Sequence, residues 1–124
     1  MDADARFWKL IERATPRSGA GTEDHAEAVQ EALTRLPVDE LIDFQITLDR
    51  HLARAYRWDL WAVAYIALGG CSDDGFEYFR LWLVAQGRDY FERALVEPER
   101  AADALSPGDE GECESLAYAA AQAY

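Results

Sequence analysis

The apolar residues of this sequence recur at intervals of three and four along almost the whole chain. Phe7, Leu10, Ile11 and Ala14 share one helical face near the start, and the same spacing returns in the later segments. This period matches the 3.6 residues of a helical turn and not the alternation of a strand. Since no segment alternates as a strand does, the sequence predicts an all-α fold.

Helix-breaking and helix-capping residues divide this pattern into six or seven helices, which we expect to form a compact bundle. Proline or glycine interrupts the periodicity near residues 16–21, 37, 69–70, 87 and 98. Thr22, Asp59 and Ser72 are each expected to cap a helix start. The predicted helices lie at residues 4–14, 22–36, 60–68, 73–86, 88–96 and 112–123, with a short helical turn within 99–105. A long third helix starts near Asp39 and Glu40, carries Leu41 to Ala55, and either stops near Arg57 or runs on.

Two of these helices are apolar enough to form a central helix pair. Residues 60–68 are nine consecutive apolar residues, and residues 76–86 are crowded with aromatic and aliphatic side chains. A helix that is apolar all round is normally buried. We therefore expect both helices at the centre of a compact fold. Five large aromatic residues are also expected to be core rather than cofactor-stacking groups: Trp8, Tyr56, Tyr65, Phe79 and Tyr90.

The length of 124 residues is typical of a single domain. Area scaling predicts a folded surface of about 6,700 Å², so the chain can bury a core without disulfides. We expect residues 1–105 to form a helical core. Residues 106–124 are expected to be an acidic linker, solvated around 107–114, and a C-terminal helix that packs on the same domain.

The charge balance limits the classes of partner. Twelve Lys and Arg stand against 24 Asp and Glu, a net charge of −12. Such a chain is not expected to bind nucleic acid directly or to associate with an anionic membrane. A protein partner fits better, and a basic one would complement the charge. Two cysteines make no disulfide scaffold, and no apolar segment opens the chain, so we expect a cytoplasmic protein.

The densest polar cluster lies at a predicted helix start and consists of Ser72, Asp73, Asp74 and Glu77. Oxygen ligands in this number could hold a divalent cation or an amine. Helix capping explains the same residues, because a serine followed by two acids suits a helix N-terminus. The spacing matches no calcium-binding loop, so capping is the favoured interpretation and no metal is predicted.

A second set of charges lies among tryptophans. Arg57 and Asp59 are close in sequence to Trp58 and Trp61, and Arg80 lies between Tyr78 and Trp82. Buried charges are costly unless they are paired, so an ion-pair network is one interpretation, with Glu77 and Arg80 on one helical face or an arginine reaching Asp59 or Asp73. A polar pocket with an aromatic wall is the other. The candidate ligand-binding residues are therefore Arg57, Trp58, Asp59, Trp61, Ser72, Asp73, Asp74, Glu77 and Arg80.

Catalytic chemistry is sparse. Cys71 precedes a helix start, but a nucleophile needs a base, and His25 and His51 are the only histidines. Nothing in the sequence brings either of them to Cys71. No phosphate loop, zinc motif or serine triad is present. The sequence thus predicts no catalytic residue and no cofactor, and it favours a protein that is not an enzyme.

One stretch is familiar. Residues 57–61 read Arg-Trp-Asp-Leu-Trp, residues 69–76 read Gly-Gly-Cys-Ser-Asp-Asp-Gly-Phe, and Tyr78-Phe79-Arg80 and Gln86-Gly87 follow. With the opening Phe7-Trp8-Lys9-Leu10-Ile11-Glu12, this resembles a bacterial family of small domains of unknown function, common in actinomycetes. The resemblance covers roughly residues 5–100. It implies a small soluble bacterial protein, and it brings no activity, cofactor or catalytic residue.

Together these observations favour a non-catalytic cytoplasmic binding or regulatory accessory protein. Its recognition surface is expected where the helix at 60–68 meets the helix at 73–86. Two alternatives stay open. One is a small-molecule-binding protein or enzyme with a polar pocket at this junction. The other is an acidic inhibitor, such as an immunity-type protein, that neutralises a basic partner.

Overall fold

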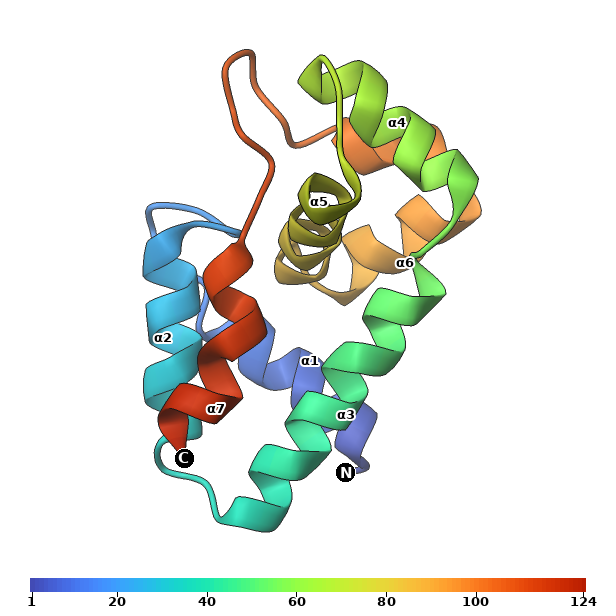
Figure 1. Ribbon diagram of the computed structural model, residues 1–124. Coiled ribbons are helices and arrows are strands. Elements are labelled where there is room, and N and C mark those ends of the chain that lie inside the picture. Colours follow the sequence, from blue (N-terminus) through green and yellow to red (C-terminus); the bar gives the residue numbers. More distant parts are fainter.

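The computed structural model describes residues 1–124 as an all-α fold without strands (Figure 1), so the predicted fold class is confirmed. The accessible surface is 6925 Å², close to the area expected for a compact chain of this mass. The α-helices are α1 (Ala3–Arg13), α2 (Glu23–Leu33), α3 (Val38–Arg54), α4 (Trp58–Leu68), α5 (Asp73–Ala85), α6 (Arg88–Val96) and α7 (Ala119–Ala123). Two 3₁₀ turns, η1 (Pro98–Ala102) and η2 (Glu114–Tyr118), complete the chain.

Helix α5 lies in the middle of the fold, with the other elements arranged around it (Figure 1). Eight of its 13 residues are buried, among them Phe76, Phe79 and Leu83, which have no exposed surface. Helices α3, α4 and α6 and the turn η2 each pack against part of it. The predicted central position of this segment is therefore correct.

Side-chain caps fix several helix starts. The hydroxyl of Thr22 accepts a hydrogen bond from the backbone of His25 at 3.1 Å, and Ser72 accepts one from Gly75 at 3.1 Å. Asp2 does the same for α1. Each bond satisfies a backbone donor that has no partner within the helix. Thr22 and Ser72 are thus confirmed as caps.

Helix α4 does not occupy the central position that its apolar sequence suggests. Only Leu60 and Ala64 are buried, whereas Trp58, Tyr65 and Ile66 are 82%, 58% and 81% exposed. The helix packs one side against η1 and α5, and no other part of the chain covers its outer side. Because almost every residue of α4 is apolar, its sequence does not show which side of the helix stays exposed to solvent.

Other boundaries also differ from the prediction. Helix α4 begins at Trp58, with Arg57 at the cap position, so Asp59 lies in the first turn and is not the cap. Helix α2 ends at Leu33, and Leu36 lies beyond it, because a residue that precedes proline is disfavoured in a helix. The expected C-terminal helix starts as the 3₁₀ turn η2 and is α-helical only from Ala119.

The C-terminal residues pack on the rest of the fold. Helix α7 lies beside α2, and the Ser115 hydroxyl donates to the Glu23 carboxylate at 2.7 Å. The backbone N–H of Cys113 donates to the Tyr78 carbonyl at 3.2 Å. Residues 106–110 are exposed, but Gly111 and Cys113 are buried, so the acidic segment is solvated over only part of its length.

The aromatic residues expected in the core divide into two groups. Trp8 and Phe79 are buried, and Tyr90 is partly buried. Tyr56 and Tyr65 are 52% and 58% exposed, so the prediction was wrong for both. The two exposed tyrosines lie on α4 and on the segment that leads into it.

No helix of the fold has both the length and the apolar character that crossing a membrane requires.

Gly21 closes the loop between α1 and α2 against the central helix. Its φ is +76°, and a Cβ atom there would lie 2.5 Å from Cδ1 of Trp82. Gly69, at the C-terminal end of α4, has a similar φ of +73°, but a Cβ there would meet nothing within 4 Å. Replacing Gly69 therefore measures the free-energy cost of the left-handed backbone alone. Replacing Gly21 adds the cost of the steric contact with Trp82.

We expect Gly21→Ala to destabilise the fold by about 2–4 kcal/mol, from left-handed strain together with overpacking. Gly69→Ala should cost only the conformational part, about 1–2 kcal/mol. Urea denaturation of both variants measures the difference in unfolding free energy. Equal losses in the two would contradict the close approach of Gly21 to Trp82.

Candidate functional site

The predicted tryptophans form a stack between α4 and α5. The ring centroids of Trp58 and Trp61 lie 5.3 Å apart at an interplanar angle of 8°, and those of Trp61 and Phe76 lie 5.1 Å apart at 13°. Tyr56 lies beside this stack, 5.9 Å from the Phe76 ring. The aromatic stack (Tyr56, Trp58, Trp61 and Phe76) thus runs from the buried surface of α5 to an outermost ring, Trp58, that is 82% exposed.

Two hydrogen bonds hold the stack in place. The indole N–H of Trp61 donates to the Cys71 carbonyl at 2.9 Å, and the Tyr56 hydroxyl donates to the Asp73 carboxylate at 2.8 Å. The first bond joins α4 to the loop before α5, and the second joins the α3–α4 connection to the first turn of α5. The Asp73 carboxylate also raises the pKa of the Tyr56 hydroxyl, because it accepts a hydrogen bond from the protonated form. The rings of Tyr56 and Trp61 are therefore fixed by hydrogen bonds within the fold.

The polar cluster at the start of α5 is a helix cap with exposed acids. Ser72 caps the helix, as described above, while Asp73, Asp74 and Glu77 are exposed. None of the three carboxylates takes part in an ion pair. No group of three or more His, Cys, Asp or Glu side chains is arranged to hold a metal ion.

Arg57 is held by a carboxylate and a helix end. Its guanidinium contacts the Asp59 carboxylate at 2.6 Å, and its Nη1 donates to the Leu95 carbonyl at 2.9 Å, in the last turn of α6. The hydrogen bond to Asp59 raises the pKa of Arg57 and lowers that of Asp59. Of the expected ion pairs, this one forms, between residues two apart on the same segment.

Arg80 is buried and binds the end of a helix instead of an acid. Its Nη1 donates to the Leu52 carbonyl at 2.7 Å, in the last turn of α3. The guanidinium carbon lies 4.5 Å from the centre of the Tyr56 ring and 5.0 Å from that of Phe76. Burial lowers the pKa of Arg80, although the charge of Glu77 opposes the shift.

The predicted pairing of Arg80 with Glu77 or Asp73 is therefore wrong, since Arg80 forms no ion pair. A positive charge at the C-terminal end of a helix is stabilised by the helix dipole and by the carbonyls that lack helical partners. Faces of aromatic rings attract the same cation. These contacts replace the carboxylate that the sequence seemed to require.

The nine candidate residues thus separate into inward and outward groups. Arg57 and Arg80 are bound to carbonyls of neighbouring helices, and Trp61 is partly buried. Trp58 and the three acids of α5 face solvent. Beside Trp58 the surface is hollowed over a volume of about 420 Å³, lined by apolar residues only: Trp58, Trp61, Ala62, Tyr65, Ile66 and Cys71. Ala62, Tyr65 and Ile66 were absent from the predicted site.

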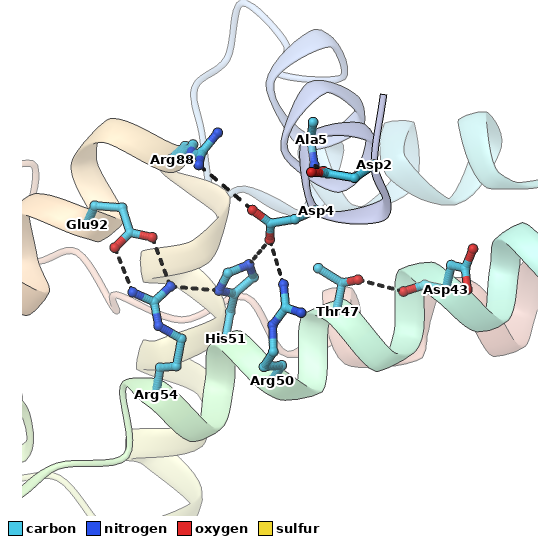
Figure 2. A network of polar contacts seen from close by, with 10 residues as sticks. All are labelled: Asp2, Asp4, Ala5, Asp43, Thr47, Arg50, His51, Arg54, Arg88 and Glu92. Carbon is cyan, nitrogen blue, oxygen red and sulfur yellow. Dashed lines mark hydrogen bonds and ion pairs between the residues drawn. The ribbon is translucent and has the colours of Figure 1, made fainter.

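A second polar cluster, which the sequence did not indicate, surrounds His51 (Figure 2). The His51 ring is buried, and its Nε2 lies 2.7 Å from the Asp4 carboxylate of α1. Arg54 donates to Nδ1 of the same ring at 3.1 Å and binds both oxygens of Glu92 of α6. Since a guanidinium can only donate, Nδ1 accepts and the ring proton lies on Nε2.

This arrangement uses both nitrogens of a neutral His51. Burial lowers the pKa of His51, and the charges of Arg54 and Arg50 add to this, while Asp4 opposes the shift. Desolvation also tends to raise the pKa of Asp4, but the hydrogen bond from His51 and the nearby arginine charges outweigh it and lower the pKa. The cluster joins α1, α3 and α6, and it offers no nitrogen to a reacting group.

His25 is likewise engaged at both nitrogens. Its Nδ1 accepts from the Gly21 backbone at 3.0 Å, and its Nε2 lies 2.9 Å from the Ile11 carbonyl. Burial lowers the pKa of His25 and raises that of the Cys71 thiol. Neither histidine is available as a base for Cys71, so no nucleophile–base pair is formed.

Comparison with known proteins adds one finding. A family model described as a protein of unknown function (DUF4240) matches residues 1–124. No curated protein and no solved structure matches the chain.

The contacts of Arg80 lead to a test by substitution. Arg80→Met keeps most of the side-chain volume but leaves the Leu52 carbonyl without its donor, so we expect a loss of about 1–3 kcal/mol in unfolding free energy. The control, Glu77→Gln, should change stability by less than about 0.5 kcal/mol, as exposed substitutions usually do. Losses of about 3–5 kcal/mol in both variants would instead indicate a buried ion pair.

The two histidines predict a loss of stability in mild acid. Because their pKa values are lowered in the fold from 6.5, the unfolded chain binds more protons as the pH falls below 6.5. Each should remove up to about 1.4 kcal/mol between pH 7.5 and 5.5. The lowered carboxylate pKa values of Asp4, Asp59 and Glu92 act at more acidic pH.

Urea titrations at pH 7.5 and 5.5 measure this loss. In His25→Gln and His51→Gln the difference between the two pH values should shrink, even where the variant is less stable at both. An undiminished pH dependence in both variants would show that other groups take up the protons.

Proposed function

Since the chain belongs to the DUF4240 family of proteins of unknown function, we propose its role from its own surface: it is a non-catalytic binding protein that docks an apolar, basic segment of a partner protein on the outer face of α4. This α4 face consists of Trp58, Trp61, Ala62, Tyr65 and Ile66. The observation that carries the proposal is the exposure of its largest side chains.

Exposure of this kind is unusual on the surface of an isolated domain. Trp58, Tyr65 and Ile66 all lie on one short helix and line a single apolar hollow. Contiguous apolar surface costs free energy in water, and it commonly marks a site of interaction. A second row of exposed apolar side chains lies on α3 and consists of Val38, Ile42 and Ile46, which are 48%, 54% and 60% exposed. It contains no aromatic residue, whereas the α4 face presents Trp58 and Tyr65 beside an apolar hollow.

The aromatic stack also prepares the face for binding. Trp58 rests on Trp61, which is fixed by Phe76 on one side and by its hydrogen bond to the Cys71 carbonyl. Ordering flexible side chains is one of the costs of association, and an ordered tryptophan avoids much of it. Tryptophan and tyrosine are also the residues most enriched among those that dominate binding energy.

The acidic side chains at the start of α5 favour a basic partner segment. The acids Asp73, Asp74 and Glu77 at the start of α5 have no ion-pair partners, while the nearby Arg57 and Arg80 are bound within the fold. Asp73 is joined to the aromatic stack through Tyr56. A segment that presents lysine or arginine next to apolar anchors would complement both features.

The engaged histidines and the thiol of Cys71, whose pKa is raised, support a non-catalytic role. The alternatives differ in what they require of the surface. A small-molecule site at the junction would use the hollow of about 670 Å³ that is lined by Tyr56, Arg57, Trp58, Asp59 and Trp61. The one arginine of this hollow is already bound to Asp59 and to the Leu95 carbonyl, which disfavours it as the anchor of a ligand. An acidic inhibitor would depend on many dispersed carboxylates and little on Trp58.

The test is selection of random peptides, displayed on phage, against the full chain. We expect the selected peptides to combine Lys or Arg with Trp, Phe or Leu. Trp58→Ala should weaken their binding, measured by fluorescence anisotropy, at least about tenfold, the equivalent of about 1.4 kcal/mol. Asp73→Asn with Asp74→Asn should weaken it further and reduce its dependence on salt.

The matched control is Ile46→Ala. The Ile46 side chain is 60% exposed, and it lies on α3 and not on α4. It should leave peptide affinity unchanged. Peptides that bind Trp58→Ala as well as the parent chain would rule out the α4 face. Selection of peptides without basic residues would rule out the basic partner.

A further inference from the structure

The α1–α3 groove, a hollow lined by residues of α1, α2 and α3 and of the N-terminus, has no connection with the α4 face. Its volume is about 560 Å³, and none of its lining residues belongs to α4 or α5. Cavities that hold small molecules are typically about 300–1,000 Å³. The groove is therefore large enough for a small ligand, and the function proposed above does not involve it.

Small side chains create the space. Ala28 and Ala32 are one turn apart on α2, so they point to the same side of that helix, and Ala14, which follows the last residue of α1, also lines the hollow. Leu10 of α1 and Phe44 of α3 complete the apolar floor. A floor of this composition favours an apolar group, because it offers no side-chain hydrogen-bonding atoms.

Cations gather at the rim of the groove. Arg6, Lys9 and Arg13 of α1 line it together with Arg35 of the α2–α3 connection, so four of the twelve basic residues of an acidic chain lie at one hollow. Positions 6, 9 and 13 of a helix share one face. This concentration is the opposite of what the net charge of −12 would suggest.

Ion pairs neutralise only part of this charge. Arg6 lies 3.5 Å from Asp43, and Arg35 lies 3.4 Å from Glu31. Lys9 and Arg13 are exposed and form no ion pair. The remaining acid of the rim is Glu40, on α3. The α1 side of the groove thus has two cations without an acidic partner, directly above an apolar floor.

We propose that the α1–α3 groove binds a small amphipathic anion, namely a carboxylate with an unbranched alkyl chain. The alkyl chain lies on the floor formed by Leu10, Ala28 and Ala32. The carboxylate lies at the rim between Lys9 and Arg13, where charge-assisted hydrogen bonds hold it. The apolar floor accounts for the alkyl chain and the two cations for the head group.

Isothermal titration of the full chain with sodium dodecanoate tests this proposal, with two comparison ligands. Butanoate has the same head group but little chain, and the dodecyltrimethylammonium cation has the same chain with the opposite charge. We expect dodecanoate to saturate one site per chain, and both comparison ligands to bind at least about tenfold more weakly.

Variants separate the two parts of the site. Lys9→Gln with Arg13→Gln should weaken dodecanoate at least about tenfold without loss of fold, because both side chains are exposed. Ala32→Phe should remove binding by filling the floor. Arg93→Gln, an exposed arginine of α6 without an ion pair, is the matched control and should bind as the parent chain does.

Trp58→Ala distinguishes this site from the α4 face. It should leave dodecanoate affinity unchanged, because Trp58 does not line the α1–α3 groove. Three results would each overturn the proposal: no saturable binding of dodecanoate, equal binding of the ammonium analogue, or unchanged affinity in the Lys9 and Arg13 double variant. Loss of binding in Trp58→Ala would also overturn it, because the alkyl chain would then lie on α4.

Discussion

The burial of α5 is the constraint on which the rest of this fold depends. The helix brings one charge into the core, Arg80, because Phe76, Phe79 and Leu83 require burial on neighbouring faces. The Arg80 guanidinium donates to the Leu52 carbonyl in the last turn of α3 and lies over the face of the Tyr56 ring. The contact places the end of α3 against α5, and the connection to α4 leaves from this point. The same contacts bring Tyr56 against Phe76, which lies at the buried end of the aromatic stack.

Local chemistry was enough to predict most of the helices. Ser72 and Thr22 cap helices because their hydroxyls reach backbone donors three residues ahead, which depends on nothing distant in the chain. Gly69 ends α4 in the left-handed conformation for a similarly local reason. The periodic spacing in α1, α3 and α6 fixed their buried faces. These features were correct because sequence neighbours determine them.

Features that depend on distant residues could not be predicted. Helix α4 is apolar on every side, so its sequence contains no periodicity to show which side is left uncovered. Arg57 pairs with Asp59 as expected, but it also donates to the Leu95 carbonyl, 38 residues away. Arg80 has no acidic partner and donates to the Leu52 carbonyl, 28 residues away. Main-chain carbonyls are present at every position, so no residue type marks them as partners. Of the contacts expected among the candidate residues, the Arg57–Asp59 pair and the Ser72 cap are present, whereas the main-chain partners of both arginines could not be foreseen.

The distribution of cations explains why the net charge says little about binding. Arg50, Arg54 and Arg88 surround Asp4 and Glu92 in the cluster that joins α1, α3 and α6, and they stabilise the fold there. What remains is uneven: the start of α5 has acids without partners, and the rim of the α1–α3 groove has cations without partners. The free acids at the start of α5 and the free cations at the rim of the α1–α3 groove lie on different parts of the surface. The net charge of −12 is therefore an average over regions of opposite local charge, and it does not by itself identify what any one region binds.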